Sequence, residues 1–336
     1  ENNEIIYPDP GFPIYRSMIK YSGAKPIPLV LSEKDDFQVN VERLESLITN
    51  KTSLVIINNP NNPTGLVYSK KELEAIVDVC REQNIIVIAD EIYAQTTYEF
   101  ENFVSMGKIY PEGTFVTNGL SKSHAAGGYR LGYVIFPQHA LDVRRQFKKI
   151  LATEYTAVTT PIQHAAVAGF QISKEMDEYF QITRQIHEIM GEYVYEKLHE
   201  IPGVTSTKPQ ATFYLLADFN RFTPEFNASK ISTSQKFSET LIQHPYHTAI
   251  VGGDSLVLER TDFSARMAFV DYDGKKAYDA FRDGSPKSHS ERLEFVKTNA
   301  PRVVSGLKMI ETYFNHLLEN AESKTNCDFS SLTVVN

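Results

Sequence analysis

The first half of the chain alternates short runs of β-forming residues with helical stretches, and this alternation constrains the fold more than any other feature. Such a pattern predicts an α/β fold, in which a largely parallel sheet is covered by helices on both faces. The expected strands are Glu4–Tyr7, Ile27–Leu31, Leu54–Ile57, Ile85–Ala89, Phe115–Asn118 and Gly132–Phe136, and the expected helices are Phe12–Tyr21, Val41–Ile48 and Lys70–Asn84.

The helix expected over Lys70–Asn84 has the strongest local signals. Ser69 stands at its N-cap, and Glu72 occupies the position that completes a capping box. Apolar residues recur at helical spacing and predict the face that packs on the sheet: Leu73, Ile76, Val77 and Cys80.

The second half of the chain has a different pattern. Lys174–Ile201 contains few helix breakers and predicts a long helix that leaves the first domain. The charged segment Asp271–Arg302 predicts a surface insertion before a final helix, Val303–Asn320. Between them we expect a smaller α+β domain with strands Thr212–Ala217, Thr248–Val251 and Ser264–Val270 and a helix over Lys236–Gln243.

These patterns predict a large domain over residues 1–172, followed by a connecting helix and a small domain over residues 173–336. A chain of 336 residues with 42% hydrophobic and 23% charged residues has an ordinary globular composition and can bury a large core. The net charge of −8 gives no basic surface for nucleic acid or an anionic membrane. The expected partner is therefore a small molecule or another protein.

The composition also bears on the cellular location. The two cysteines, Cys80 and Cys327, are too far apart in sequence for a disulfide framework or a metal-binding motif, which is typical of a reducing compartment. The longest apolar runs, such as Ile85–Ala89, are strand-sized and well below the ~18 residues of a membrane span. No signal peptide is visible. We expect a cytoplasmic protein with no metal site.

Polar clusters follow three of the expected strands. They comprise Asn58–Gly65, Asp90–Tyr93 and Ser121–Lys122. Because ligands bind at the carboxyl ends of parallel strands, these clusters are expected to meet at one edge of the sheet and form a site.

The first two clusters have both a structural and a functional interpretation. N-N-P-N-N-P-T-G, from Asn58 to Gly65, is typical of a turn, but Asn62 would also present an amide donor to a ligand oxygen. Asp90 could be a helix N-cap, or its carboxylate could hold a proton on a buried cationic ring nitrogen. Tyr93 would supply a phenol at the same place.

In the third cluster, Lys122 lies among small residues, in the stretch S-K-S-H-A-A-G-G. A desolvated lysine amine is a nucleophile toward an aldehyde. Arg130 could be an ordinary surface arginine or a phosphate ligand. The neighbouring His124 is better explained as a polar residue beside the pocket than as an acid or base. A cofactor with an aldehyde, a phosphate, a phenolic oxygen and a protonated ring nitrogen would use all these groups, and pyridoxal 5′-phosphate has them.

Four motifs in order over Ile5–Pro137 resemble the large domain of class I/II (fold type I) pyridoxal-phosphate-dependent aminotransferases. They are Y-P-D-P-G-F-P-I-Y, N-N-P-N-N-P-T-G, A-D-E-I-Y and N-G-L-S-K-S-H-A-A-G-G-Y-R-L-G-Y. Weaker similarity continues through A-T-F-Y-L-L-A-D-F and F-S-A-R-M-A-F into the small domain. The resemblance implies a mostly parallel sheet between helices, a smaller α+β C-terminal domain, pyridoxal 5′-phosphate as cofactor and a homodimer.

The resemblance also implies roles for individual residues. It makes Lys122 the Schiff-base lysine and proton shuttle, Asp90 the partner of the ring nitrogen, and Asn62 and Tyr93 donors to the phenolic oxygen. Arg266 would pair with the substrate carboxylate, beside Asn62, although from the residues alone a structural ion pair is nearly as good an explanation. The remaining implied roles are Arg130 and Ser121 at the phosphate, Phe12 stacked on the cofactor ring and Tyr15 supporting Asp90.

The implied activity is transfer of an amino group between an L-amino acid and a 2-oxo acid, by ping-pong kinetics through the Lys122 Schiff base. Two alternatives remain. The first is another enzyme on the same scaffold, either a β-lyase or a cyclase. The second is a module without catalysis. N-G-L-S-K, from Asn118 to Lys122, is similar to the motif of alanine-type transaminases and is a weak indication of the substrate.

The sequence differs from the family pattern in three places. The family's large domain begins well before Tyr7, with a loop that binds the cofactor phosphate, so we expect a longer natural protein with a segment upstream of Glu1. T-A-I-V-G-G-D-S-L, before Arg266, lacks the proline-glycine turn expected there. The segment Asp271–Arg302 is longer than the usual ending and could form a lid or an interface.

Overall fold

The computed structural model describes residues 3–256 and 258–330, with side chains through Glu319. Cys327 therefore lies outside the described side chains. Residue contacts divide the chain into unit 1, residues 1–188 with Gln210–Thr212, and unit 2, residues 189–209 with 213–336. The domain boundary expected at residue 172 stays a prediction.

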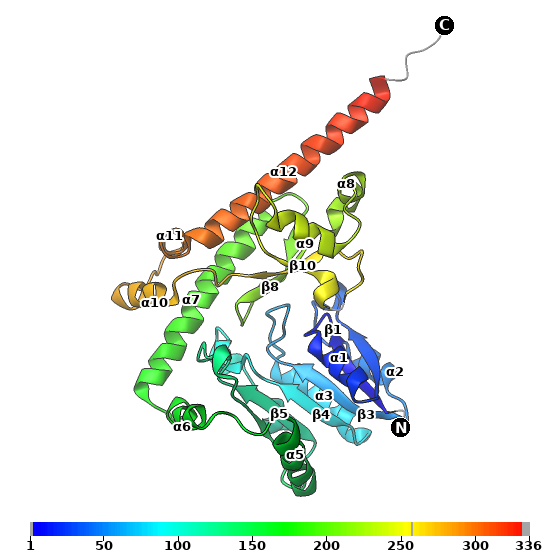
Figure 1. Cartoon of the computed structure of the whole chain (residues 1–336), viewed down its shortest axis with the longest axis vertical. Helices are drawn as coiled ribbons and strands as arrows, with labels where there is room; N and C mark the ends of the chain where they lie inside the picture. Colours follow the sequence, from blue (N-terminus) through cyan, green and yellow to red (C-terminus); the bar gives the residue numbers. More distant parts are fainter. Residues whose placement is uncertain (1–2, 257, 331–336) are drawn as a thin grey trace. The chain divides into compact units, whose positions relative to one another are not determined.

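Unit 1 contains a six-stranded sheet in the order β2-β1-β3-β4-β5-β6 (Figure 1). The first five strands are parallel to their neighbours, and β6 is antiparallel to β5. This confirms the expected α/β fold with a largely parallel sheet. The strands are β1 (Glu4–Asp9), β2 (Lys25–Val30), β3 (Thr52–Asn58), β4 (Ile86–Asp90), β5 (Thr114–Gly119) and β6 (Gly132–Ile135).

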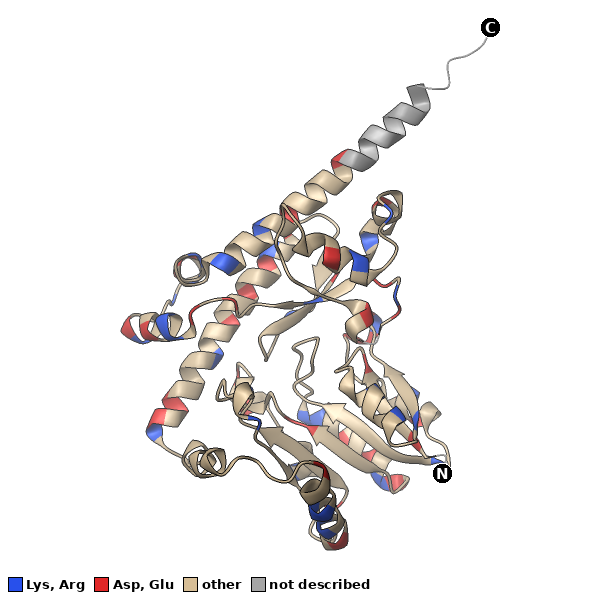
Figure 2. Ribbon diagram, viewed as in Figure 1, with Lys and Arg blue, Asp and Glu red and all other residues tan. Residues whose placement is uncertain are grey.

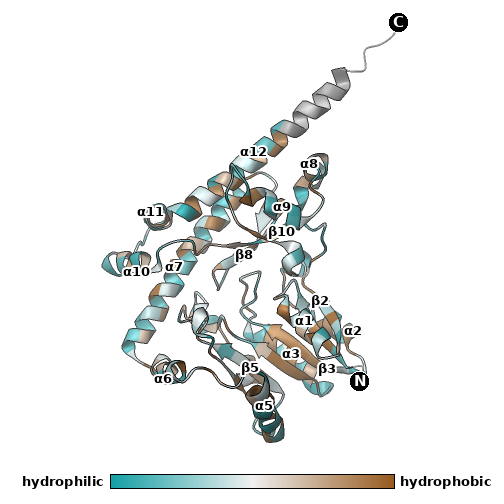
Figure 3. Ribbon diagram, viewed as in Figure 1, coloured by the Kyte–Doolittle hydropathy of each residue, from teal (hydrophilic) through white to brown (hydrophobic). Residues whose placement is uncertain are grey.

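Helix α3 (Lys70–Glu82) forms as its sequence predicts. Ser69 Oγ accepts the amide of Glu72, and the Glu72 carboxylate accepts the amide of Ser69, so the capping box is complete. The apolar stripe joins the core of unit 1, to which the hydrophobic strand β3 also belongs (Figure 3). All four of its residues are buried: Leu73, Ile76, Val77 and Cys80.

The other helices of unit 1 lie in the segments between its strands or after the last strand. Helices α1 and α2 match expected helices, whereas α4, α5 and α6 were missed. Helix α4 is a single turn and α6 has a weak helical period, but the apolar residues of α5 do recur at helical spacing. Their bounds are α1 (Ile14–Tyr21), α2 (Val41–Leu47), α4 (Met106–Ile109), α5 (Leu141–Glu154) and α6 (Thr160–Gly169).

The long helix α7 (Lys174–His199) forms as expected and passes from unit 1 into unit 2. Unit 2 has an antiparallel sheet in the order β7-β8-β10-β9. Its core is rich in stacked phenylalanine rings, including Phe219, Phe226 and Phe314. The strands are β7 (Thr205–Ser206), β8 (Tyr214–Asp218), β9 (Val251–Gly252) and β10 (Ser264–Ala268), and the helices are α8 (Thr223–Ala228), α9 (Ser234–Ile242) and α12 (Pro301–Ser330).

Two expectations for unit 2 were wrong in detail. The strand expected over Thr248–Val251 is reduced to the two residues of β9, which pair with β10. The charged segment Asp271–Arg302 contains two regular helices, α10 (Gly274–Asp283) and α11 (His289–Asn299), each begun by a side-chain cap. Its charges lie on exposed helix faces. Within the described residues, no helix is long and apolar enough to cross a membrane.

Candidate active site

The carboxyl ends of β3, β4 and β5 bring the polar clusters together. Asn58, the last residue of β3, is in register with Asp90, the last residue of β4, which is in turn in register with Thr117 on β5. The parallel pairing of these strands therefore places the loops that follow them at one edge of the sheet. The clusters that begin at Asn58 and Asp90 therefore lie side by side in unit 1, while their roles at a site stay predictions.

The loop after β3 is held tightly by its own amides. Asn58 Nδ2 donates to the backbone oxygen of Asp90 over 2.9 Å, and Asn58 Oδ1 accepts the amide of Asn62 over 2.8 Å. Asn61 Oδ1 accepts the hydroxyl of Thr64 over 2.8 Å. These contacts fix the backbone around the buried Asn62, so the turn and the ligand-donor interpretations of this motif are compatible.

Asp90 has a dense set of neutral hydrogen-bond donors. Tyr15 Oη donates to Oδ2 over 2.5 Å, and the amide of Ile92 donates to Oδ1 over 3.2 Å. Although part of its surface is exposed, the surrounding protein desolvates the carboxylate and raises its pKa, while Tyr15, Ile92, Lys122 and Thr117 lower it. A cation beside this carboxylate would stabilise its charged form.

Lys122 is the cation that acts on Asp90 within the described site. Its Nζ lies 5.7 Å from the ring centroid of Tyr93, within range of a cation–π contact. Tyr93 is 3% exposed, and Lys122 is half-buried, as expected for an amine held in a pocket. Lys122, Asp90 and Tyr93 therefore form one cluster.

Phe12, between β1 and α1, and Tyr15, in the first turn of α1, approach this cluster. The rings of Phe12 and Tyr15 meet edge to face, with centroids 5.6 Å apart. Burial, followed by the charge of Asp90, raises the pKa of the Tyr15 phenol well above its ordinary value, so it stays a donor at neutral pH. Phe12 remains partly exposed at the rim of the cluster.

Ser121 and Arg130 lie on either side of the turn that follows Lys122. Arg130 is exposed, has a left-handed backbone with φ of 56° and donates from Nη1 to the oxygen of Gly127 over 2.7 Å. Ser121 is half-buried beside Gly127. The guanidinium is thus exposed at the surface of unit 1. A group that is to bind a phosphate must be accessible in this way before the phosphate arrives.

Arg266 lies in unit 2, on β10. It is in register with Leu216 on β8, and its guanidinium carbon lies 4.4 Å from the ring centroid of Tyr214. Because Arg266 and Lys122 belong to different units, its role at the substrate stays a prediction.

Two residues at this edge of the sheet, Glu91 and Thr117, were not singled out from the sequence. Glu91 is 4% exposed, and its Oε1 accepts the hydroxyl of Ser105 and the amide of Met106, each over 2.9 Å. Desolvation raises the pKa of Glu91 to about 7. Its position directly after Asp90 was a usable signal, because a strand that is apolar up to its end rarely continues with two carboxylates. Thr117 gave no such signal.

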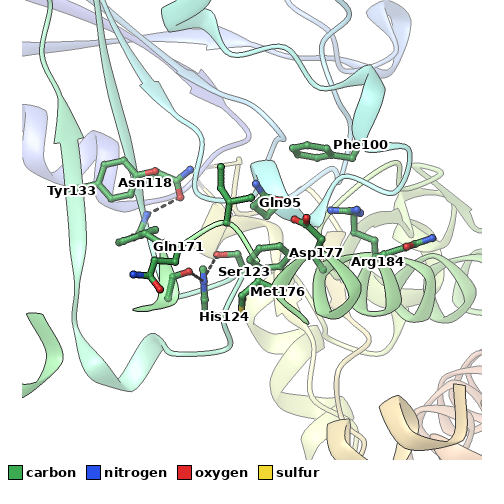
Figure 4. Close-up of a pocket in the computed structure, with 16 residues that line it drawn as sticks. Gln95, Phe100, Asn118, Ser123, His124, Tyr133, Gln171, Met176, Asp177 and Arg184 are labelled. Carbon is green, nitrogen blue, oxygen red and sulfur yellow. Dashed lines mark hydrogen bonds between the residues drawn. The ribbon is translucent and has the colours of Figure 1, made fainter. Parts of the chain in front are cut away.

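A pocket of about 390 Å³ lies beside the lysine turn (Figure 4). His124 forms part of its wall: Nε2 donates to the oxygen of Gly169 over 2.9 Å, and Ser123 Oγ lies 2.8 Å from Nδ1. The imidazole ring also packs edge to face on Phe180, with centroids 5.2 Å apart. His124 thereby ties the lysine turn to the end of α6 and to the first turns of α7.

Comparison with known proteins identifies the family. The model of aminotransferase class I and II matches residues 1–270, so the chain belongs to this family. Aspartate aminotransferase of Geobacillus stearothermophilus is 35% identical over 218 residues, which are 64% of this chain and 54% of that protein. The probable aspartate/prephenate aminotransferase of Aquifex aeolicus is 31% identical over 76% of this chain and 63% of that protein. The chain thus spans little more than half the length of these curated relatives.

Solved structures agree with this assignment. Alanine aminotransferase of Pyrococcus furiosus superposes with a TM-score of 0.74 and 28% identity, covering 94% of this chain and 71% of that one. The aromatic aminotransferase of Pyrococcus horikoshii gives a TM-score of 0.75 and 26% identity, covering 94% and 74%. The fold is therefore that of fold type I aminotransferases.

Enzymes of this family depend on pyridoxal 5′-phosphate, and the residues present fit that group. The desolvated carboxylate of Asp90 suits a protonated ring nitrogen, and the amine of Lys122 suits an aldehyde. Tyr93 and Asn62 offer neutral donors, and Arg130 offers a permanent cation to a phosphate.

Proposed function

We propose that the protein is an aminotransferase that exchanges an amino group between an L-amino acid and a 2-oxo acid. The observation that carries the proposal is the cluster of Lys122, Asp90 and Tyr93 at the carboxyl ends of β4 and β5. Here a lysine amine, a desolvated carboxylate and a phenol lie together in a chain of the aminotransferase family.

The cofactor, when bound, supplies the carbon that accepts the amino group and the ring that takes up electrons. In our proposal Lys122 Nζ would hold the aldehyde of the cofactor, and the same amine would carry the proton of the substrate α-carbon. Asp90 holds a proton at the ring nitrogen, kept in place by Tyr15. Tyr93 and Asn62 donate to the ring oxygen.

The remaining roles concern binding. Phe12 packs on the ring face, Ser121 and Arg130 hold the phosphate, and Arg266 pairs with the substrate carboxylate, beside Asn62. Because the same amine serves both halves of the exchange, ping-pong kinetics are expected. The relatives are named for aspartate, prephenate, aromatic amino acids and alanine, and we propose only the shared part of these substrates, the α-amino acid. A homodimer and a cytoplasmic location remain part of the proposal.

The test is a single half-reaction. The protein loaded with pyridoxal 5′-phosphate is mixed with aspartate, alanine or tyrosine without any 2-oxo acid, and pyridoxamine 5′-phosphate is measured by chromatography. We expect one amino acid to convert the cofactor, 2-oxoglutarate to restore it, and Lys122→Ala to stop both.

The matched control is Lys148→Ala, which removes an exposed lysine of α5 and should leave the conversion unchanged. A β-lyase would release ammonia and a 2-oxo acid without forming pyridoxamine 5′-phosphate, and a cyclase would leave it unformed as well. Either outcome would replace transamination as the activity.

A further inference from the structure

Unit 2 contains a pocket that shares no residue with the candidate active site. Its volume is about 560 Å³, which falls within the roughly 300–1,000 Å³ that small-molecule sites occupy. The walls are the loop between α9 and β9, the end of β10 and the first turns of α12, with Val194 of α7 beside them. All the lining residues belong to unit 2, so the pocket lies within one unit. We call it the α12 pocket.

Half of the α12 pocket lies beyond the part of the chain that matches the family. The match to the family model ends at residue 270, and half of the 16 lining residues follow that point, from Asp271 to Ile310. Between Asp271 and Arg302 the chain forms α10 and α11, with charges of both signs on α10 (Figure 2), and then returns to the pocket at α12. The pocket is thus built where this chain continues past the family match.

One part of the lining of the α12 pocket is apolar. It consists of Val194, Met267 and Ile310, which are buried, together with the half-buried Met309. Methionine side chains adapt to the shape of whatever packs on them. Gly306 lines the same space: glycine inside a helix is unfavourable, but here it leaves α12 without a side chain that would fill the pocket. This apolar part suits the apolar side chain of a ligand.

Two opposite charges line the α12 pocket, one at each end of the segment that contains α10 and α11. Arg302 Nε lies 2.8 Å from Asp271 Oδ1, and each side chain is 68% exposed. Within the described residues this contact is the one hydrogen bond or ion pair of either side chain, so Asp271 Oδ2 and the two terminal nitrogens of Arg302 are open to a ligand. An exposed ion pair contributes little by itself, so its atoms can turn to a ligand at small cost.

The start of α12 adds donors for a carboxylate. Ser305 follows Arg302 by three residues, so the two side chains lie on the same face of the helix. Both residues are exposed and line the pocket. The first amides of a helix have no partner within it, and their end of the helix dipole is positive. A carboxylate is therefore favoured beside Arg302, and a cationic group is favoured beside Asp271.

An apolar surface, a place for a carboxylate and a place for a cation within one pocket suit a zwitterion with an apolar side chain. We propose that the α12 pocket binds a free α-amino acid of this kind. Its carboxylate pairs with Arg302 and Ser305, its ammonium group pairs with Asp271 Oδ2, and its side chain packs on Met267 and Met309. The ligand thereby joins the end of β10 to the start of α12. The inference does not depend on the proposed activity.

The test uses L-tryptophan as the probe. The chain contains no tryptophan, so the fluorescence polarisation of the added amino acid reports its own binding. The protein is titrated into the probe twice, once after loading with pyridoxal 5′-phosphate and removal of the excess, and once without the cofactor. The variants are Arg302→Gln and Asp271→Asn, and the matched control is Arg282→Gln, which removes an exposed arginine of α10 that lies 3.7 Å from Asp279. Arg266→Gln reports on the candidate active site instead.

We expect saturable binding, with or without the cofactor, that weakens roughly tenfold or more in Arg302→Gln and in Asp271→Asn, as for a lost hydrogen bond to a charged group. Arg282→Gln and Arg266→Gln should bind as the natural protein does. Thermal unfolding of each variant verifies that it is folded.

Two indole compounds test the class of ligand in the same assay. Tryptamine lacks the carboxylate and indole-3-propionate lacks the ammonium group, so each should bind much more weakly than L-tryptophan. Absence of saturable binding would overturn the proposal, as would binding that Arg302→Gln and Asp271→Asn leave intact, or equal binding of either indole compound. Binding that is lost in Arg266→Gln alone would overturn it in favour of the candidate active site.

Discussion

Tyr15 donates its phenolic hydrogen to Asp90 across 75 residues of sequence, with Oη 2.5 Å from Oδ2. The contact joins the start of α1 to the end of β4 and gives the desolvated carboxylate a neutral donor. Desolvation raises the pKa of Asp90, and the hydrogen bond from Tyr15 opposes that rise, so the contact favours the charged form that a cationic ring nitrogen would need.

Replacing Tyr15 with Phe should weaken the proposed site and leave the fold intact. A hydrogen bond to a charged group contributes about 1.5–3 kcal/mol, so kcat should fall roughly 10- to 100-fold. The loss should grow as pH falls, because without this donor the pKa of Asp90 rises further. The measurement is a pH profile of kcat for both proteins. Profiles that coincide would show that Tyr15 does not act through Asp90.

Glu91 makes stability depend on pH. Its pKa is about 7 in the folded protein against an ordinary value of 4.5, because burial disfavours the charge. Below pH 4.5 Glu91 is protonated in both the folded and the unfolded state, so its burial does not reduce the free energy of unfolding. Between pH 4.5 and 7 the unfolded chain loses its proton first, so stability falls as pH rises, by about 3 kcal/mol in total.

The variant Glu91→Gln keeps an oxygen acceptor for Ser105 and Met106 but cannot ionise. We therefore expect its free energy of unfolding, relative to the natural protein, to rise through this pH window and to level off above pH 7. Urea unfolding at a series of pH values tests this. A difference that stays flat with pH would mean that Glu91 is ionised in the folded state.

Gly119 allows β5 and β6 to approach closely just before the lysine turn. A Cβ at this position would lie 2.7 Å from the oxygen of Leu131 and 2.9 Å from Cα of Gly132. Gly119→Ala should cost roughly 1–3 kcal/mol of unfolding free energy, since backbone must shift. Gly128→Ala is the control, because a Cβ there meets nothing within 4 Å, and its effect should stay within about 0.5 kcal/mol.

His124 should act as a structural link between the lysine turn and the end of α6. His124→Phe loses the half-buried bond to Gly169 and should lower the unfolding free energy by about 0.5–1.5 kcal/mol, the net contribution of a typical hydrogen bond. His124→Gln can restore a donor to that oxygen and should recover most of the loss. If both variants lose kcat with unchanged stability, His124 takes part in the chemistry instead.

The sequence predicted the elements whose signals are local. The capping box at Ser69 and the apolar strands up to Asp90 carry their own periodicity, and both were found as expected. The meeting of the clusters that begin at Asn58 and Asp90 followed from the rule for parallel strands.

What could not be predicted depends on tertiary context. Helix α5 was missed although Val143, Phe147 and Ile150 recur at helical spacing, so in this case the local signal was present and was overlooked. The hydrogen bonds of Glu91 to Ser105 and Met106 could not be predicted either, because only the folded backbone brings these residues together. The helices α10 and α11 were not predicted, because their charged composition is equally typical of a surface loop.

The central claim is that Lys122 is the residue that binds the cofactor. The most direct measurement is to load the protein with pyridoxal 5′-phosphate, make the lysine link permanent with borohydride and locate the modified peptide by mass spectrometry. We expect one modified residue, Lys122, no stable modification in Lys122→Ala, and unchanged labelling in Lys148→Ala. Modification at another lysine, or equal modification of the Lys122→Ala protein, would contradict it.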